Sequence, residues 1–130
     1  MAHPNEDAFR AGYDAFLRGD LEAIRGLLAD DVVWHQPGDN AVSGDYRGPD
    51  QVLGLFGKLM EMTGGTFRPE PHDFLANDQH AVALITLSAE RGGRSITDNE
   101  THVVHMRDGK IAESWVQLGD AYRELDAFFS

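Results

Sequence analysis

The chain has 130 residues, no cysteine, and 22 acidic against 11 basic side chains, which gives a formal net charge of −11. A chain of this length supports one hydrophobic core, so we expect a single domain over residues 1–130. The acidic excess argues against nucleic acid and anionic membranes as partners, and the absence of cysteine excludes disulfides and thiolate metal sites. No signal peptide pattern and no run of roughly 20 apolar residues is present, which predicts a cytoplasmic location.

The first half of the sequence predicts three helices and one strand. Apolar residues recur at helical spacing in three segments, over residues 9–17, 21–31 and 52–63. Residues 32–35, between the second and third segments, form a β-branched and aromatic run that a proline and a glycine end. The turn-rich stretch over residues 38–48 predicts a loop that is long enough to cover a site.

The second half predicts an antiparallel meander. Alternation typical of strands starts after Thr66, and turn signals at residues 77–78, 92–93 and 108–109 divide this segment into four strands. The first of the four contains two prolines, so it should be bent or lie at a sheet edge. A short helix at the C-terminus completes the order. These elements predict an α+β fold, with a cone-shaped, curved antiparallel (mixed) β-sheet wrapped around three N-terminal helices.

Several segments resemble a known superfamily. Residues 19–24 and 29–35 look like the second helix and first strand of the nuclear-transport-factor-2-like fold, and residues 107–111 with 113–115 are similar to its last hairpin. This superfamily includes SnoaL-like polyketide cyclases, ketosteroid isomerases and limonene-epoxide hydrolases. The resemblance covers essentially the whole chain. The resemblance is specific for the fold. It is a poor guide to the reaction, because proteins of this fold include both enzymes and binding modules.

The resemblance places two histidines where ketosteroid isomerases have carboxyl groups. His35 stands at the end of the first strand, the place of their general base, and His102 stands where they have the protonated aspartic acid that binds an oxyanion. The isomerase tyrosine aligns with Gly12, one position from Tyr13. The resemblance therefore implies that His35 and His102 converge on one cavity. Imidazole titrates near neutral pH, so the pair could act as general base and as general acid or oxyanion donor.

Alternation along the strand over residues 96–106 gives an independent view of the cavity. Residues two apart share a face of a strand, and the face that carries Glu100 and His102 mixes apolar and ionisable groups, as a pocket wall does. Glu100 should then lie close enough to hold His102 in one tautomer and raise its proton affinity. A β-bulge would bring Asn99 inward instead.

Other side chains are candidates for the cavity wall. Trp115 and Gln117 share a face of the last strand, and Gln117 stands where the epoxide hydrolases have an aspartate that helps to activate water. Trp34 is expected to point away from His35 and to pack behind the sheet against a helix. The remaining candidate contacts, on the helices, the loop and the edge strand, are Tyr13, Tyr46, Phe56, Met60 and His72. The spacing of the six histidines does not match a metal site, so we expect no metal and no cofactor.

These residues and the resemblance favour a cofactor-independent isomerase, cyclase or hydratase that acts on a hydrophobic, carbonyl-containing molecule of polyketide or steroid type. His35 would take a proton next to the carbonyl, and His102, oriented by Glu100, would stabilise the enolate. The alternative is a ligand-binding or assembly module of the same fold that catalyses no reaction. The expected partners are a small hydrophobic molecule and a second copy of the chain, in a homodimer formed through the sheet.

Overall fold

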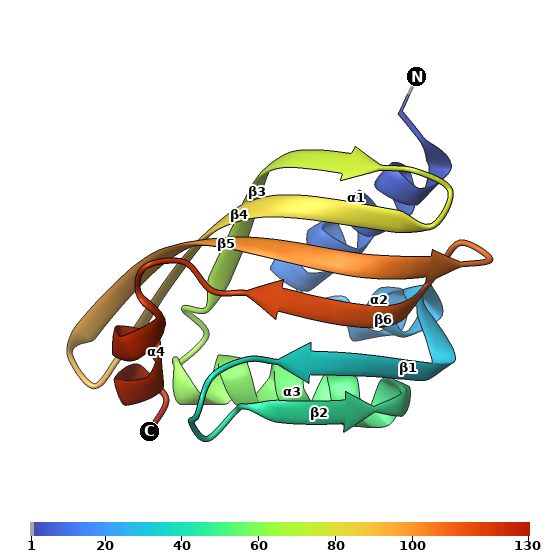
Figure 1. The fold of residues 1–130 in the computed structure, drawn as a ribbon. Helices are drawn as coiled ribbons and strands as arrows, with labels where there is room; N and C mark the ends of the chain where they lie inside the picture. The colour runs from blue at the N-terminus through green and yellow to red at the C-terminus, as the bar shows by residue number, and fades with distance from the viewer. Residues whose placement is uncertain (1) are drawn as a thin grey trace.

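A computed structural model describes residues 2–130 (Figure 1). In this part of the chain four helices accompany one six-stranded sheet, which confirms the predicted α+β class. The elements in chain order are α1 (Pro4–Leu17), α2 (Leu21–Leu27), β1 (Leu28–Gln36), β2 (Gly44–Arg47), α3 (Gly48–Met62), β3 (Arg68–Ala76), β4 (His80–Arg91), β5 (Arg94–Arg107), β6 (Lys110–Gln117) and α4 (Tyr122–Phe128).

The first two helices begin where local side chains satisfy their free backbone N–H groups. Pro4 occupies the first turn of α1, where its missing N–H breaks no helical hydrogen bond, and His3 Nδ1 accepts the backbone N–H of Asn5 at 3.0 Å. Asp20 caps α2 by accepting the backbone N–H of Ala23 at 3.1 Å.

The strand order is β2-β1-β6-β5-β4-β3, with β1 parallel to β6 and the other neighbouring pairs antiparallel. Strands β3 to β6 form the predicted meander. Gly92 and Gly93 both have positive φ, of 58° and 79°, which gives the tight turn between β4 and β5. β3 lies at the sheet edge and its register shifts between Pro71 and Asp73, as expected for a strand that contains two prolines.

Two boundaries differ from the prediction. Helix α2 ends at Leu27 rather than near Asp31, and β1 follows directly at Leu28. The stretch predicted as a loop contains the short strand β2, which pairs with β1 through Trp34 and Tyr46. The sequence of β2 shows no apolar alternation, so only its pairing with β1 makes it a strand.

Helices α1, α2 and α3 pack on the same face of the sheet, behind the strands in Figure 1. Along β5 every second residue from Ile96 to Met106 is buried on the inner face of the sheet, and the residues between them are exposed or half-buried. The predicted inner face of this strand, which includes Glu100 and His102, is therefore confirmed. Within residues 2–130 no helix is both long and apolar enough to cross a membrane.

Candidate functional site

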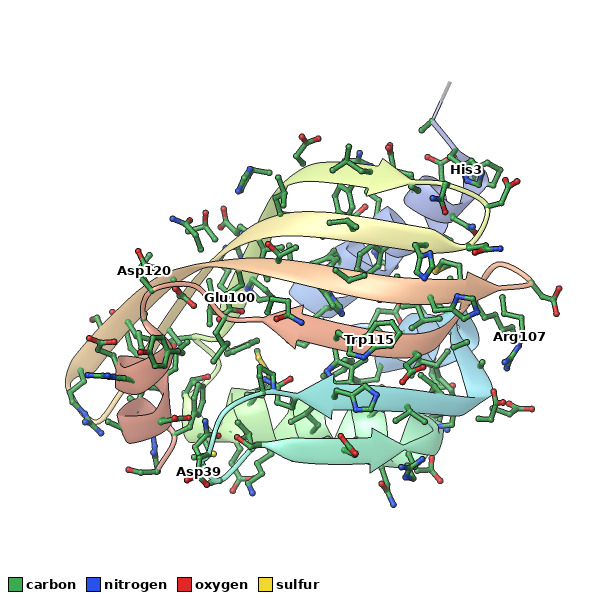
Figure 2. The ribbon with its side chains drawn as sticks, in the orientation of Figure 1. His3, Asp39, Glu100, Arg107, Trp115 and Asp120 are labelled. Carbon is green, nitrogen blue, oxygen red and sulfur yellow. The ribbon has the colours of Figure 1, made fainter. Side chains whose placement is uncertain are left out.

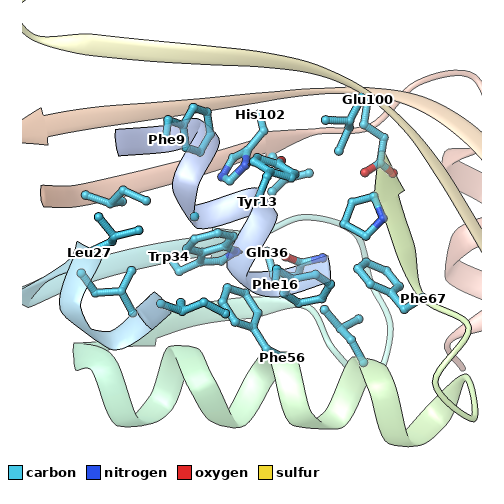
Figure 3. A pocket seen from close by; sticks show the side chains of 18 residues that line it. Phe9, Tyr13, Phe16, Leu27, Trp34, Gln36, Phe56, Phe67, Glu100 and His102 are labelled. Carbon is cyan, nitrogen blue, oxygen red and sulfur yellow. Dashed lines mark hydrogen bonds between the residues drawn. The ribbon is translucent and has the colours of Figure 1, made fainter. Parts of the chain in front are cut away.

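A cavity of about 90 Å³ lies between the helices and the inner face of the sheet (Figure 3). Most of its wall is apolar, and the polar side chains that line it are those of Tyr13, Gln36, Glu100 and His102. Its aromatic lining consists of Phe9, Tyr13, Phe16, Trp34, Phe56 and Phe67. No lysine or arginine is among its lining residues in the described part of the chain. The cavity therefore offers no positively charged side chain to pair with an anionic ligand.

His102 lies at the centre of a buried hydrogen-bond chain. Its Nδ1 is 2.7 Å from the Tyr13 hydroxyl, and its Nε2 is 2.6 Å from the Ser114 hydroxyl. Burial lowers the pKa of His102 to about 3, so the ring is neutral at physiological pH. Because both ring nitrogens are already paired inside the protein, His102 can orient Tyr13 but has no free nitrogen to offer a ligand.

Glu100 supplies the cavity's carboxyl group. It is 7% exposed, and no described residue provides a hydrogen-bond partner for its Oε2 atom. Burial raises the pKa of Glu100 to about 8, and the nearby Asp98 adds to the rise. Burial and the charge of Glu100 together raise the pKa of Tyr13 well above its ordinary value, which keeps the phenol protonated. The cavity thus places a phenol and a carboxyl of unusually high pKa near one another.

Asp98 ties the wall of the cavity to the C-terminal segment. Its carboxyl oxygens accept the backbone N–H groups of Gly119 at 2.9 Å and of Ala121 at 3.2 Å. Asp98 and Glu100 are two residues apart on the inner face of β5, so the connection from β6 to α4 is anchored beside Glu100.

The expectation that His35 and His102 converge on one cavity is wrong. His35 lies on the outer face of the sheet, where its Nδ1 is 2.7 Å from Asp45 and its Nε2 is 2.6 Å from Glu113. The hydrogen bond with Glu113 contributes most to raising the pKa of His35, and the hydrogen bond with Asp45 adds to the rise. The ring stacks on Trp115, which also lies on this face (Figure 2). His35 therefore links β1 to its neighbours β2 and β6 outside the cavity.

Trp34 takes the inner position instead. It lines the cavity, with ring centroids 4.8 Å from His102 and 5.0 Å from Phe56, and its Nε1 donates to Gln36 Oε1 at 3.2 Å. The expectations that Trp34 points away from His35 and packs against a helix are therefore confirmed, but the expectation that it lies behind the sheet, outside the cavity, is wrong. Val32, Trp34 and Gln36 alternate along the inner face of β1, so His35 must point the other way.

The other predicted contacts divide between the two faces. Tyr13 and Phe56 line the cavity, as expected. The predicted neighbours Glu100 and His102 both line it too, although the partners of His102 are Tyr13 and Ser114 rather than Glu100. The predicted residues that do not line the cavity are Tyr46, Met60, His72, Asn99, Trp115 and Gln117.

Each of these exceptions has a structural reason. Trp115 and Gln117 do share a face of β6, but it is the outer one, because Ser114 and Val116 occupy the inner face. Asn99 points outward from β5 without a bulge and receives a hydrogen bond from Thr86.

Three further exceptions are explained by their own surroundings. The hydroxyl of Tyr46 donates a hydrogen bond to the backbone carbonyl oxygen of Val42, at 2.7 Å. His72 is exposed at the register shift of the edge strand, and Met60 is only half-buried near the end of α3.

Sequence reasoning missed two members of the site, Gln36 and Ser114. The sequence did contain a sign of Ser114. It is a small polar residue that shares a face of β6 with Ala112 and Val116, and the charged Glu113 lies on the opposite face. Within residues 2–130 no group of three His, Asp or Glu side chains is arranged to hold a metal ion. The predicted homodimer stays a prediction.

Comparison with known proteins gives a consistent result. A family model described as a SnoaL-like domain matches residues 9–114. An uncharacterised protein of Mycobacterium tuberculosis is 33% identical over 106 residues, which cover 81% of each chain. The structure of Bal32a, from a soil-derived mobile gene cassette, has a TM-score of 0.93 at 27% identity and covers 98% of this chain and 97% of its own.

The structure of TerC, co-crystallised with polyporic acid, has a TM-score of 0.83 at 25% identity and covers 96% of this chain and 99% of its own. Other similar structures, at 21–22% identity, are described as candidate polyketide cyclases, and at that identity they show the fold alone. The family match spans well over half of the chain and coincides with the elements that build the cavity. The chain belongs to the family of SnoaL-like domains.

Proposed function

We propose that the cavity binds a small, largely apolar carbonyl compound, and that the protein moves a proton at the carbon next to the carbonyl without a cofactor. One observation carries this proposal: Glu100 is a buried carboxyl that lines an apolar cavity and leaves its Oε2 atom without a partner among the described residues. A buried, unpaired carboxyl oxygen is costly, which favours a role in binding or chemistry over a role in stability.

In this mechanism Glu100 is the base. A carboxylate takes a proton most effectively when its pKa is close to the working pH, and a pKa of about 8 leaves about one molecule in ten ionised at pH 7. The carboxylate removes the C–H proton, and the electron pair of that bond moves through the carbon to the carbonyl oxygen. The Tyr13 hydroxyl donates a hydrogen bond to the resulting oxyanion.

The fate of the enolate decides the reaction. If Glu100 returns its proton to a different carbon, the product is an isomer. If the enolate carbon attacks a second carbonyl carbon in the same molecule, a ring closes and the proton of Glu100 passes to the new alkoxide. Both outcomes agree with the cofactor-free isomerase or cyclase expected from the sequence, with Glu100 and Tyr13 replacing His35 and His102 as the reacting groups. Binding of an organic ligand by a relative, TerC, supports this use of the fold.

The size of the cavity limits the ligand. At about 90 Å³ it is smaller than the roughly 150 Å³ of a cavity that holds benzene. Phe16 and Phe67 are half-buried and lie with Glu100 toward one end of the cavity (Figure 3). A ligand of the size of benzene or larger, acetophenone included, must therefore displace these two rings or project past them.

Hydrogen exchange at the carbon next to a carbonyl tests the proposal without knowledge of the natural substrate. We expect the protein to accelerate the replacement of the methyl protons of acetophenone by deuterium in D2O, followed by proton NMR. Glu100→Gln removes the base and should lower the protein-dependent rate about 100-fold. Glu113→Gln makes the same change on the outer face and should keep the parent rate. Equal rates in the parent protein, in Glu100→Gln and in buffer would contradict the proposal.

Shortening Phe67 should change the preference for ligand size. Its ring lines the cavity and lies 6.0 Å from that of Phe16, so Phe67→Ala opens space beside Glu100. We expect the affinity for 2-acetylnaphthalene, relative to that for acetophenone, to rise about tenfold, as measured by calorimetric titration. Leu75→Ala, at a position 55% exposed on β3, is the control and should leave this ratio unchanged. An unchanged ratio in Phe67→Ala would show that the cavity does not hold the ring.

A binding role without a reaction is the second candidate. It is favoured by the pairing of both His102 nitrogens inside the protein, which leaves Tyr13 and Glu100 as the ionisable side chains of the described cavity lining that could exchange a proton with a ligand. In that case acetophenone should raise the melting temperature of the protein while its methyl protons exchange no faster than in buffer.

A further inference from the structure

Three buried side chains form a linear hydrogen-bond chain that ends at the cavity. Ser114 on β6 is fully buried, His102 on β5 is 3% exposed and Tyr13 on α1 is 8% exposed. The Ser114 hydroxyl and the Tyr13 hydroxyl each have His102 as their only side-chain hydrogen-bond partner within residues 2–130. Tyr13 lines the cavity and Ser114 does not, so the chain has one end inside the protein and one end at the ligand site.

A neutral imidazole has one N–H donor and one acceptor nitrogen, so this chain can run in two directions. In the first, Tyr13 donates to Nδ1 and Nε2–H donates to Ser114, which leaves the Ser114 proton without an acceptor. In the second, Ser114 donates to Nε2 and Nδ1–H donates to the Tyr13 oxygen, which leaves the Tyr13 proton free.

The two directions differ in where the unpaired proton lies. In the first direction it belongs to a hydroxyl that has no exposed surface and does not line the cavity. In the second direction it belongs to a phenol that lines the cavity, where water or a bound carbonyl oxygen can accept it. A buried donor without an acceptor is destabilising, so the second direction is favoured.

We propose that Ser114 is a positioning residue: by donating to Nε2 of His102 it fixes the Nδ1–H tautomer and leaves the Tyr13 hydroxyl to donate to a ligand in the cavity. This inference rests on the proposed function for the identity of the ligand, but not for the direction of the chain. The hydrogen bond from Nδ1–H to the phenol oxygen also polarises the phenol and strengthens its own donation. A serine that contacts no ligand thereby determines which group the ligand meets.

The tautomer of His102 in the ligand-free parent protein is the first test. Long-range proton–nitrogen NMR on protein labelled with nitrogen-15 histidine distinguishes a protonated from an unprotonated ring nitrogen, and loss of one signal set in His102→Gln assigns the residue. We expect Nδ1 to be protonated and Nε2 to be unprotonated. A protonated Nε2 would overturn the proposal, and this test needs neither a ligand nor a folded Ser114 variant.

The second test follows the carbonyl group of a probe. Acetophenone labelled with carbon-13 at the carbonyl should show a downfield shift on binding, because Tyr13 donates to its oxygen. We expect Ser114→Ala to reduce both this shift and the population of the Nδ1–H tautomer, and to weaken binding about fivefold, the effect of one hydrogen bond between neutral groups. Ser114→Thr keeps the hydroxyl and should restore both signals.

The outcomes separate the two proposals. If acetophenone does not bind to the parent protein, the proposed function fails, while the tautomer measurement still decides the role of Ser114. If acetophenone binds and Ser114→Ala leaves the tautomer and the carbonyl shift unchanged, the role of Ser114 is refuted and the proposed function stands.

Discussion

Glu100→Gln should be more stable than the parent protein at high pH, and the difference should grow with pH. The pKa of Glu100 is about 8 in the folded protein, against 4.5 for the unfolded chain. Between these values the folded protein holds a proton that the unfolded chain has released, so the free energy of unfolding of the parent falls as pH rises. The slope is about 1.4 kcal/mol per pH unit over this range, and the full difference, reached above about pH 8, is on the order of 5 kcal/mol.

Glutamine has the same shape and does not ionise, so the variant lacks this loss. Burial lowers the pKa of His102 to about 3, which gives an opposite slope between about pH 3 and 6.5, but this contribution is common to both proteins and cancels in the difference. Urea unfolding of both proteins at pH 5, 7 and 9 measures the effect. Glu90→Gln removes a charge at an exposed position and serves as the control. A difference that does not change between pH 5 and 9 would show that Glu100 ionises normally.

Gly119→Ala should destabilise the protein by roughly 3–5 kcal/mol, the range for loss of a buried polar network. A Cβ at this position would overlap the backbone carbonyl oxygen of Asn99 and lie 2.5 Å from Asp98 Oδ1. The connection from β6 to α4 would have to move away from β5. Asp98, which is 5% exposed, would then lose the two backbone N–H groups of Gly119 and Ala121.

Gly54→Ala is the matched control for this change. Gly54 lies inside α3 and is exposed, and a Cβ there would meet nothing within 4 Å. Alanine favours the helix, so we expect this variant to be stabilised by about 0.5–1 kcal/mol. Thermal and urea unfolding of both variants check the pair. A Gly119→Ala protein as stable as its parent would mean that Asp98 does not anchor the C-terminal segment.

The sequence was sufficient to predict the inner face of β5, because that strand is long and its alternation is unambiguous. Ile96, Val104 and Met106 fix the phase, and Glu100 and His102 then fall on the same face. The α+β class and the order of the elements other than β2 followed from periodicity and turn residues in the same way.

The phase of β1 could not be predicted as well. Val32 and Val33 are both apolar, so the composition of this strand does not say which of its faces is inside. The predicted inner face of β1 rested on the resemblance to ketosteroid isomerases. It aligned His35 with their catalytic carboxylate and so placed His35 inside. Since neighbouring residues of a strand point to opposite faces, an error of one position exchanged Trp34 with His35.

The partners of His35 and His102 also lay beyond the reach of the sequence. Asp45 comes from β2, a strand that exists only through its pairing with β1, and Ser114 and Tyr13 come from segments far apart in the chain. Such contacts depend on register and on the packing of α1 against the sheet. A single sequence does not specify these features.

The titration of Glu100 itself tests most directly whether this carboxyl is the base. Carbon-13 NMR of the labelled glutamate carboxyl groups, with Glu100→Gln for assignment, gives the midpoint of its ionisation in the folded protein. We predict a midpoint near pH 8 that coincides with the midpoint of the protein-catalysed exchange of the acetophenone methyl protons. A midpoint below pH 5, or an exchange rate that does not follow this titration, would contradict the assignment of Glu100 as the base.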